Sequence, residues 1–297
     1  MTLTPLVSET LVRAGLDPEH VAHVARRALD EDLMGGVDVT SVATVPFDQE
    51  GVADIVVRTH GVVAGIPVAA AVFELAADDD LDVTMRLADG DDVRPGDVVL
   101  TAVGLTRTLL TAERSALNLI CHLSGVATQT RRWVDAVSGT KAVILDTRKT
   151  TPGLRVLEKY AVRCGGGSGF RMGLSDAAMV KDNHVIAAGG VVEAYNAVRL
   201  TFPDVPIEVE VDRVDQVVPA IEAGADLLLL DNMTTEELRE CVRLADGRAR
   251  LEASGGLTLD RAREVAETGV DYLSVGALTH SAPVLDMGFD LRPREGD

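Results

Sequence analysis

Charged residues follow two short apolar segments in the middle of the chain. Asp146-Thr147-Arg148-Lys149 comes after Ala142–Leu145, and Lys181 comes directly after Ala177–Val180, with Arg171 in the stretch between them. Arg presents a planar fork that fits carboxylate or phosphate oxygens, and Lys presents a point charge. These residue types predict a site for an anionic ligand, provided that the apolar segments bring them together.

Carboxylates and glycines follow the later apolar segments. Glu210 lies near the end of Ile207–Val211, and Asp231 follows the next segment. Both are suited to ribose hydroxyls, which they would bind directly or through magnesium. Ser254-Gly255-Gly256 precedes a predicted helix, so its backbone N–H groups are placed to cradle a phosphate; a plain tight turn is the alternative. Gly276 ends the last segment in the same way.

The charge distribution agrees with a small anionic ligand. The chain carries a formal net charge of −19, which disfavours nucleic acid as a partner. Residues 141–184 run against this trend, with eight Lys and Arg against four acids, a local charge of +4. A basic island in an acidic protein is typical of an anion-binding pocket, although a solvated basic face would give the same count.

Several protein classes are disfavoured by composition. No run of eighteen apolar residues occurs, so no membrane span is expected, and the N-terminus lacks the basic start and apolar core of a secretion signal. The three cysteines, Cys121, Cys164 and Cys241, are far apart and odd in number. They predict neither a disulfide framework nor a zinc site, and we expect a reducing, cytoplasmic setting.

The second part of the chain predicts a parallel sheet that would position these residues. Apolar strands alternate with helices of about ten residues, which is typical of βαβ units. No GxGxxG follows a strand, so a partial (β/α) barrel is favoured over a dinucleotide-binding fold, and its active site is expected at the carboxyl ends of the strands. The predicted strands are 142–145, 177–180, 207–211, 225–230, 249–253 and 270–275, and the predicted helices are 191–200, 216–223, 234–244 and 259–268.

The first 110 residues predict a smaller α+β domain. A helix is expected over 18–33, short strands over 53–58 and 61–64, and a pair of hairpin strands within 89–104. Asp78-Asp79-Asp80 predicts a solvated turn. A long amphipathic stretch, 111–137, is expected to be a helix that leads into the barrel.

Three features permit a structural explanation as well as a functional one. Asp146 could be an ion-pair partner of the neighbouring cations rather than a ligand-binding group. Gly165-Gly166-Gly167 fits either a flexible linker or a loop that closes over substrate. His184 and His280 could be packing residues.

The strand-end motifs resemble those of one enzyme family. Asp146-Thr147-Arg148-Lys149 continues as TTPGLR to residue 155, and this stretch is similar to the signature of the quinolinate phosphoribosyltransferases. Further motifs follow the family's order along nearly the whole chain, which makes the resemblance specific. They are ALDEDL (28–33), DVTS (38–41), ERSALNL (113–119), HLSGVAT (122–128), KYAVR (159–163), KDNH (181–184), EVEV (208–211), LDN (230–232), SGG (254–256) and GALTH (276–280).

The resemblance implies an architecture and an assembly. The family fold has an N-terminal α/β sandwich, expected at residues 1–116, and a partial TIM-like α/β barrel of about six to seven strands, expected at 117–280. The tail, 281–297, is expected to return to the first domain. Family members are homodimers or larger, and each active site borrows an arginine from the neighbouring subunit; by position that arginine is Arg114.

The resemblance also assigns roles to the strand-end residues. The implied reaction transfers the phosphoribosyl group of phosphoribosyl pyrophosphate to quinolinate, with Mg²⁺ as cofactor. The implied acceptor-binding residues are Arg148, Arg171 and Lys181, with Arg114 from the neighbouring subunit; Phe170 occupies a position of the acceptor pocket, and Thr147 is an implied substrate-binding residue. Lys149 would face the pyrophosphate, and Glu210 and Asp231 would hold ribose and magnesium. The 5′-phosphate would lie against Ser254, Gly255, Gly256, Val275, Gly276 and Ala277.

One position departs from the family pattern. After the triple glycine the family has a variable residue, then Asn or Ser, His and Arg, whereas this chain has Ser168-Gly169-Phe170-Arg171. Because the family histidine helps to form the acceptor pocket, Phe170 leaves open a related phosphoribosyltransferase that uses another aromatic or pyridine carboxylate. Two further alternatives are a barrel aldolase with Lys181 as Schiff-base nucleophile and a non-catalytic metabolite-binding protein.

Overall fold

The computed structural model describes residues 3–77 and 81–294 and divides into two compact units. The first unit comprises 1–129, 151–166 and 281–297, and the second comprises 130–150 and 167–280. The first boundary between the units falls after residue 129, in the same long helix as the boundary expected at residue 116, and a helical segment after the DTRK loop groups with the first unit. The turn predicted at 78–80 and the last three residues of the predicted tail lie outside the described residues.

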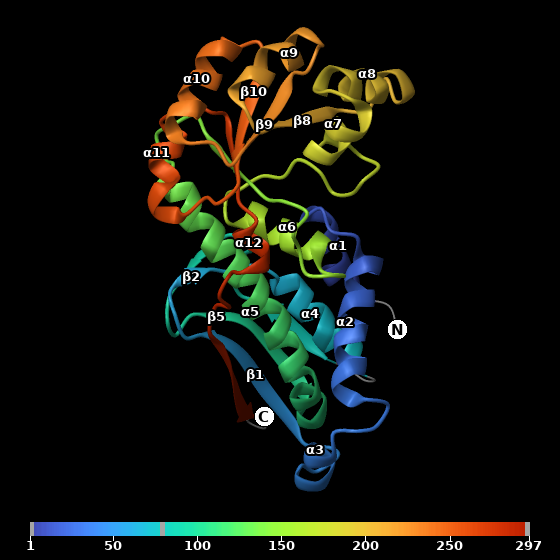
Figure 1. Cartoon of the computed structure of the whole chain (residues 1–297). Helices are drawn as coiled ribbons and strands as arrows, with labels where there is room; N and C mark the ends of the chain where they lie inside the picture. The colour runs from blue at the N-terminus through green and yellow to red at the C-terminus, as the bar shows by residue number, and fades with distance from the viewer. Residues whose placement is uncertain (1–2, 78–80, 295–297) are drawn as a thin grey trace. The chain divides into compact units, whose positions relative to one another are not determined.

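The first unit is built on a four-stranded antiparallel sheet with the order β12-β1-β5-β3. Its last strand, β12, pairs with β1 from Gly51–Pro293 to Val57–Met287, as Figure 1 shows in dark red and blue. The elements that begin in this unit are α1 Pro5–Arg13, α2 Pro18–Leu33, α3 Val39–Thr44, β1 Glu50–Val57, β2 Gly61–Val62, α4 Ile66–Ala76, β3 Asp82–Met85, β4 Asp92–Val93, β5 Val98–Leu105, α5 Thr106–Ala136, α6 Arg155–Cys164 and β12 Met287–Pro293.

Local sequence accounts for the helices of this unit. Helix α2 begins where the Asp17 side chain accepts from the Glu19 N–H at 3.1 Å, with Pro18 in the first turn. Helix α4 is buried over Ile66–Phe73, as its uniformly apolar sequence requires. The hairpin predicted within 89–104 is wrong: β4 pairs with β2, and β5 pairs with β1 and β3.

Buried side chains tie α6 to the rest of the first unit. Glu158 is fully buried; its carboxylate contacts His122 Nε2 at 2.8 Å and accepts from the Thr151 N–H at 3.0 Å. The Tyr160 hydroxyl donates to Asp89 at 2.6 Å. These bonds explain why residues 151–166 belong to this unit although they lie between two strands of the other.

The second unit is built on a six-stranded parallel sheet with the order β6-β11-β10-β9-β8-β7. This confirms the predicted α/β fold, for which a partial (β/α) barrel of about six to seven strands was expected. Its elements are β6 Val143–Leu145, β7 Ala178–Val180, α7 Asp182–Ala188, α8 Val191–Thr201, β8 Ile207–Val211, η1 Val214–Gln216, α9 Val217–Glu222, β9 Leu227–Asp231, α10 Thr235–Ala245, β10 Arg250–Ser254, η2 Leu259–Arg261, α11 Ala262–Ala266, β11 Tyr272–Ser274 and α12 Ala277–His280.

The strand register brings the carboxyl ends of the strands to one edge. Ser254 lies opposite Asp231, and Ser274 lies opposite Leu145. Strand β9 is buried on both faces, as expected of a central parallel strand whose sequence is Leu-Leu-Leu-Leu-Asp. Helix α8 packs against β7 and β8, α10 packs against β10, and α11 packs against β11 (Figure 1). Within residues 3–77 and 81–294, no helix is both long and apolar enough to cross a membrane.

Candidate active site

A cavity of about 460 Å³ opens at the carboxyl edge of the parallel sheet. Residues from β6 to β11 contribute to its walls, so the sheet gathers side chains that are far apart in the sequence. The lining residues are Asp146, Thr147, Arg148, Lys149, Phe170, Arg171, Met179, Lys181, Glu208, Glu210, Leu229, Asp231, Asn232, Glu252, Ser254, Gly255, Gly256 and Ser274. Most of the predicted site residues of the second unit are among them.

Four cations line the cavity: Arg148, Lys149, Arg171 and Lys181. Arg171 is only 9% exposed, and its guanidinium donates to the Ala177 carbonyl at 3.3 Å. Burial, with the nearby charge of Arg148, lowers the pKa of Arg171 from its usual value. The Lys181 ammonium lies 3.4 Å from a Glu210 oxygen. A guanidinium has five N–H donors and an ammonium has three, so this group of cations is suited to a ligand with more than one carboxylate.

Three of these cations also border a second, more apolar cavity. Its volume is about 570 Å³, and Arg148, Arg171, Met179 and Lys181 line both spaces. Much of the remaining wall is alanine, valine and leucine from β7, α7, α8 and the loop before β7. The cations therefore lie between a polar cavity and an apolar one, an arrangement that is suited to an aromatic acid.

Two carboxylates, Glu210 and Asp231, also line the polar cavity. Glu210 projects from β8, and Asp231 ends β9, where it accepts from the Asn232 side-chain amide at 2.7 Å. In the described part of the chain, no three His, Cys, Asp or Glu side chains gather as a metal site made by protein alone would require. Two carboxylates nevertheless fit Mg²⁺, which commonly takes its remaining ligands from water and substrate phosphates.

Two further acids lie at the floor of the cavity and were not predicted as site residues. Glu208 is fully buried and Glu252 is 3% exposed, and both line the cavity. Burial, followed by the neighbouring charge of Glu252, raises the pKa of Glu208 to about 9. Burial also raises the pKa of Glu252, while a hydrogen bond from the Ser274 hydroxyl opposes this shift. The sequence signal that could have identified both residues is an acidic side chain within an otherwise apolar strand.

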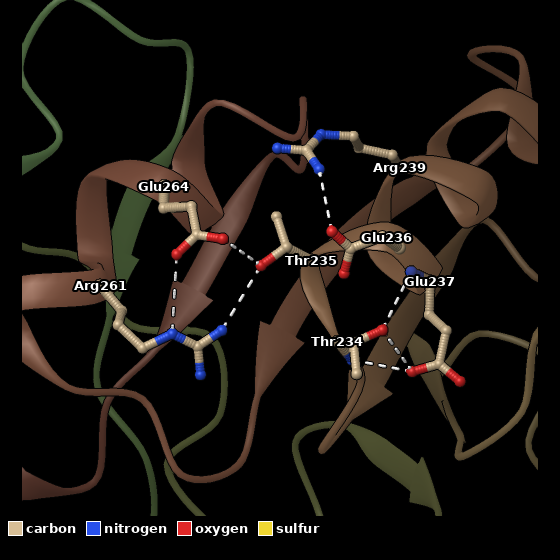
Figure 2. A network of polar contacts seen from close by, with 7 residues as sticks. All are labelled: Thr234, Thr235, Glu236, Glu237, Arg239, Arg261 and Glu264. Carbon is tan, nitrogen blue, oxygen red and sulfur yellow. Dashed lines mark hydrogen bonds and ion pairs between the residues drawn. The ribbon is translucent and has the colours of Figure 1, made fainter.

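The turn after β10 has the backbone that a phosphate cradle needs. Gly255 has a φ of +86°, and a Cβ there would lie 2.3 Å from the Asn232 side-chain oxygen, so only glycine fits. Figure 2 shows how the adjacent helix start is braced: Thr234 caps α10 with Glu237, and Arg261 donates to Thr235 at 3.4 Å. The backbone of this turn therefore lies open beside a well-fixed helix start.

Four predicted residues do not line the cavity. Val275, Gly276 and Ala277 form the turn after β11, beside Lys149: a Cβ at Gly276 would lie 3.0 Å from Lys149 Cδ. Arg114 belongs to the first unit, where it lies on α5 with its side chain 62% exposed.

Comparisons with known proteins agree with this site. Residues 38–124 match the N-terminal domain and 126–290 the C-terminal domain of quinolinate phosphoribosyl transferase. The chain is 52% identical to a nicotinate-nucleotide pyrophosphorylase [carboxylating] of Mycobacterium leprae, over 90% of this chain and 95% of that protein. It is 42% identical to a probable enzyme of the same name from Bacillus subtilis, over 88% and 90%.

The solved structures point the same way. The crystal structure of NadC from Streptococcus pyogenes superposes with a TM-score of 0.90 at 38% identity, covering 94% of this chain and 99% of that one. The relatives' names lend no support to a different acceptor. This chain, with both domains matched and its strand-end motifs gathered at one cavity, belongs to the quinolinate phosphoribosyltransferase family.

Proposed function

We propose that this protein transfers the phosphoribosyl group of phosphoribosyl pyrophosphate to quinolinate and removes one carboxylate, giving nicotinate mononucleotide, pyrophosphate and carbon dioxide in NAD biosynthesis. The observation that carries the proposal is that four cations, Arg148, Lys149, Arg171 and Lys181, line one cavity together with Glu210, Asp231 and the glycine turn 254–256. Relatives named nicotinate-nucleotide pyrophosphorylase [carboxylating], at up to 52% identity, support the choice of quinolinate.

Quinolinate carries two adjacent carboxylates, which match the cations that line the cavity. Arg148, Arg171 and Lys181 would bind these carboxylates and so fix the ring nitrogen toward the ribose carbon. Lys181 is 49% exposed and lies 3.4 Å from Glu210. A lysine that forms a Schiff base is usually desolvated or lies beside another cationic group. The exposed Lys181 side chain lies beside a carboxylate instead, and this environment disfavours the aldolase alternative.

The ribosyl group would lie between the acceptor and the phosphate turn. The ring nitrogen uses its lone pair to bond to the ribose carbon as the bond from that carbon to pyrophosphate breaks. Glu210 and Asp231 would face the ribose hydroxyls and stabilise the positive charge that develops there. Glu210 and Asp231 would also hold Mg²⁺, which neutralises phosphate charge when bound. Lys149 would bind the pyrophosphate that leaves.

Decarboxylation follows from the charge that the first step creates. Once the ring nitrogen is ribosylated, the ring is cationic. The bond between the ring and its 2-carboxylate then breaks, carbon dioxide leaves, and the electron pair remains on the ring carbon, where the adjacent cationic nitrogen stabilises it. A proton taken up at that carbon completes nicotinate mononucleotide. The cations that hold the second carboxylate keep the ring in place during this step.

Two further features are part of the proposal. The active site is proposed to be completed in a homodimer by Arg114 of a second copy, because Arg114 is exposed and matches the family motif by position.

A reducing, cytoplasmic setting is proposed because Cys121, Cys164 and Cys241 are all free thiols.

A pyrophosphate-release assay tests the proposed function. The purified chain is supplied with phosphoribosyl pyrophosphate, Mg²⁺ and quinolinate labelled at the 2-carboxylate. We expect equal amounts of pyrophosphate and labelled carbon dioxide, and neither without quinolinate. Nicotinate, which lacks the 2-carboxylate, is the matched control and should support little release. Pyrophosphate release that does not depend on quinolinate would overturn the proposal.

A further inference from the structure

The backbone of Lys149 is held by two threonine hydroxyls. Its N–H donates to Thr147 Oγ1 at 3.0 Å, and its carbonyl accepts from Thr279 Oγ1 at 2.7 Å. Thr279 is only 2% exposed, whereas Lys149 is an exposed residue. Because water has little access to the Thr279 hydroxyl, this hydrogen bond is well protected, and it fixes the point from which the lysine side chain leaves the backbone.

Thr279 lies in α12, immediately after the turn 275–277. Its hydroxyl is also 3.2 Å from the Gly276 carbonyl, but a hydroxyl has one proton, and the shorter contact is the one to Lys149. A Cβ at Gly276 would lie 3.0 Å from Lys149 Cδ and 3.1 Å from His280 Nε2. The absence of a side chain at Gly276 therefore leaves the space that the lysine stem occupies.

The strands explain why such a link is needed. Strands β6 and β11 pair as far as Leu145–Ser274, and the Val275 N–H still donates to the Leu145 carbonyl at 3.0 Å. Beyond this point the strand pairing ends, and the loop that carries Lys149 and the turn 275–277 leave the sheet separately. The hydrogen bond from the Thr279 hydroxyl to the Lys149 carbonyl connects these two segments again. Lys149 lies four residues after Leu145, and Thr279 lies four residues after Val275.

We propose that Thr279 is a positioning residue that sets Lys149 against the turn 275–277, so that the lysine ammonium and the backbone of the turn act on phosphate groups of one ligand. The inference rests on the proposed function for the identity of that ligand, phosphoribosyl pyrophosphate. Thr279 itself, which is buried, acts through Lys149 and does not touch the ligand.

Three variants test the role of the hydroxyl. Thr279→Val keeps the size of the side chain and removes the donor, and Thr279→Ser keeps the donor. We expect Thr279→Val to lower kcat/KM for phosphoribosyl pyrophosphate by about three- to tenfold, the loss of one ordinary hydrogen bond, with KM for quinolinate within about twofold. Thr279→Ser should stay within about twofold throughout. Thr279→Ala replaces the valine variant if that variant fails to fold.

Thr268→Val is the matched control. Thr268 is also buried, at 7% exposure, and its hydroxyl donates to the Val265 carbonyl at 2.7 Å, but it lies at the end of α11 and does not line the cavity. This variant makes the same chemical change away from Lys149, and we expect unchanged kinetic constants. An equal loss of kcat/KM in Thr268→Val, or in Thr279→Ser, would reject a specific positioning role.

A binding cycle separates positioning from a general structural effect. The affinity for inorganic pyrophosphate is measured by calorimetry for wild type, Thr279→Val, Lys149→Met and the double variant. If Thr279 acts through Lys149, the valine substitution weakens binding in wild type but has no further effect in Lys149→Met. Additive losses would overturn the proposal. Because this cycle needs no turnover, it remains decisive even if quinolinate proves not to be the acceptor.

Discussion

Gly169 lies directly against the carboxylate of Asp146: a Cβ atom at residue 169 would be 2.8 Å from both of its oxygens. Asp146 is 5% exposed, and its N–H donates to the Ser168 carbonyl at 3.0 Å. The segment before Phe170 therefore runs alongside β6 at very close range. The family's Asn or Ser at this position would require Asp146 to move, so the glycine and the placement of Asp146 belong together.

We expect Gly169→Ala to destabilise the protein by about 1–3 kcal/mol, because the added methyl group overpacks a buried carboxylate. Urea unfolding measures this change. Gly173→Ala is the matched control, since a Cβ there meets nothing closer than 3.9 Å. Equal stability of Gly169→Ala and wild type would show that Asp146 has room to turn away.

We expect Phe170→His, made with Gly169 retained, to raise kcat/KM for quinolinate by about tenfold or more. Phe170 lines the polar cavity but cannot donate a hydrogen bond. A histidine there can donate to a carboxylate, and a bond to a charged group is worth about 1.5–3 kcal/mol. Phe170→Leu serves as the control for lost aromatic volume. If Phe170→His leaves kcat/KM within about twofold, this position does not set acceptor preference.

The buried acids predict a pH dependence of stability. The folded pKa of Glu208 is about 9, above its ordinary 4.5, so the protonated carboxyl contributes stability below pH 4.5 that is lost as pH rises toward 9. The raised pKa of Glu252 acts in the same direction. We expect Glu208→Gln to flatten the fall in Tm between pH 5 and pH 9 and to raise Tm at the alkaline end.

Glu222→Gln controls for this pH experiment, because Glu222 is exposed on α9. It should leave the pH profile of Tm as in wild type. If the pH profile of Tm for Glu208→Gln parallels that of wild type over the whole range, Glu208 is ionised in the folded protein although it is buried.

Removal of magnesium should abolish turnover. Glu210 and Asp231 are negatively charged, as are the phosphates of phosphoribosyl pyrophosphate, so a divalent cation is needed to neutralise the charge when both are in one site. We expect pyrophosphate release to stop in excess EDTA and to return when Mg²⁺ exceeds the chelator. Full activity in EDTA would remove the cation from the mechanism.

Mixed dimers test whether the site is shared between copies. Arg114→Ala and Lys149→Ala should each be inactive alone, because each lacks one cation of the proposed site. If Arg114 acts in the neighbouring copy, mixing the two variants restores up to about one quarter of wild-type activity, since half of the dimers are mixed and each has one intact site. The absence of recovery, with subunit exchange shown by native mass spectrometry, would place both residues in one copy.

Much of the second unit could be predicted because its strands are marked by their own composition. Strand β8 occupies the predicted residues 207–211, and polar residues at the strand ends do meet at one cavity. Parallel order forces this convergence, so no knowledge of side-chain packing was needed. The pairing of β4 with β2 was not predictable, because turn-rich sequence indicates where strands end and not which partners they choose.

The interior of the site was harder to predict. The spacing of Glu208 and Glu210 places both on one face of β8, but their different burial depends on the depth of the cavity, which arises from neighbouring strands. Thr279 gave no signal at all, since its hydroxyl matters only because α12 returns it to Lys149. Such contacts are set by tertiary structure, and a single sequence carries no local mark of them.

The pairing of β12 with β1 has a consequence for folding during translation. Strand β1 is synthesised before the parallel sheet of the second unit, whereas its partner β12 is synthesised after that sheet. While the parallel sheet is translated, the edge of β1 that later pairs with β12 has no β12 partner. An unpaired strand edge of this kind can bind other chains or chaperones. The four-stranded sheet is therefore completed only after the second unit has been synthesised.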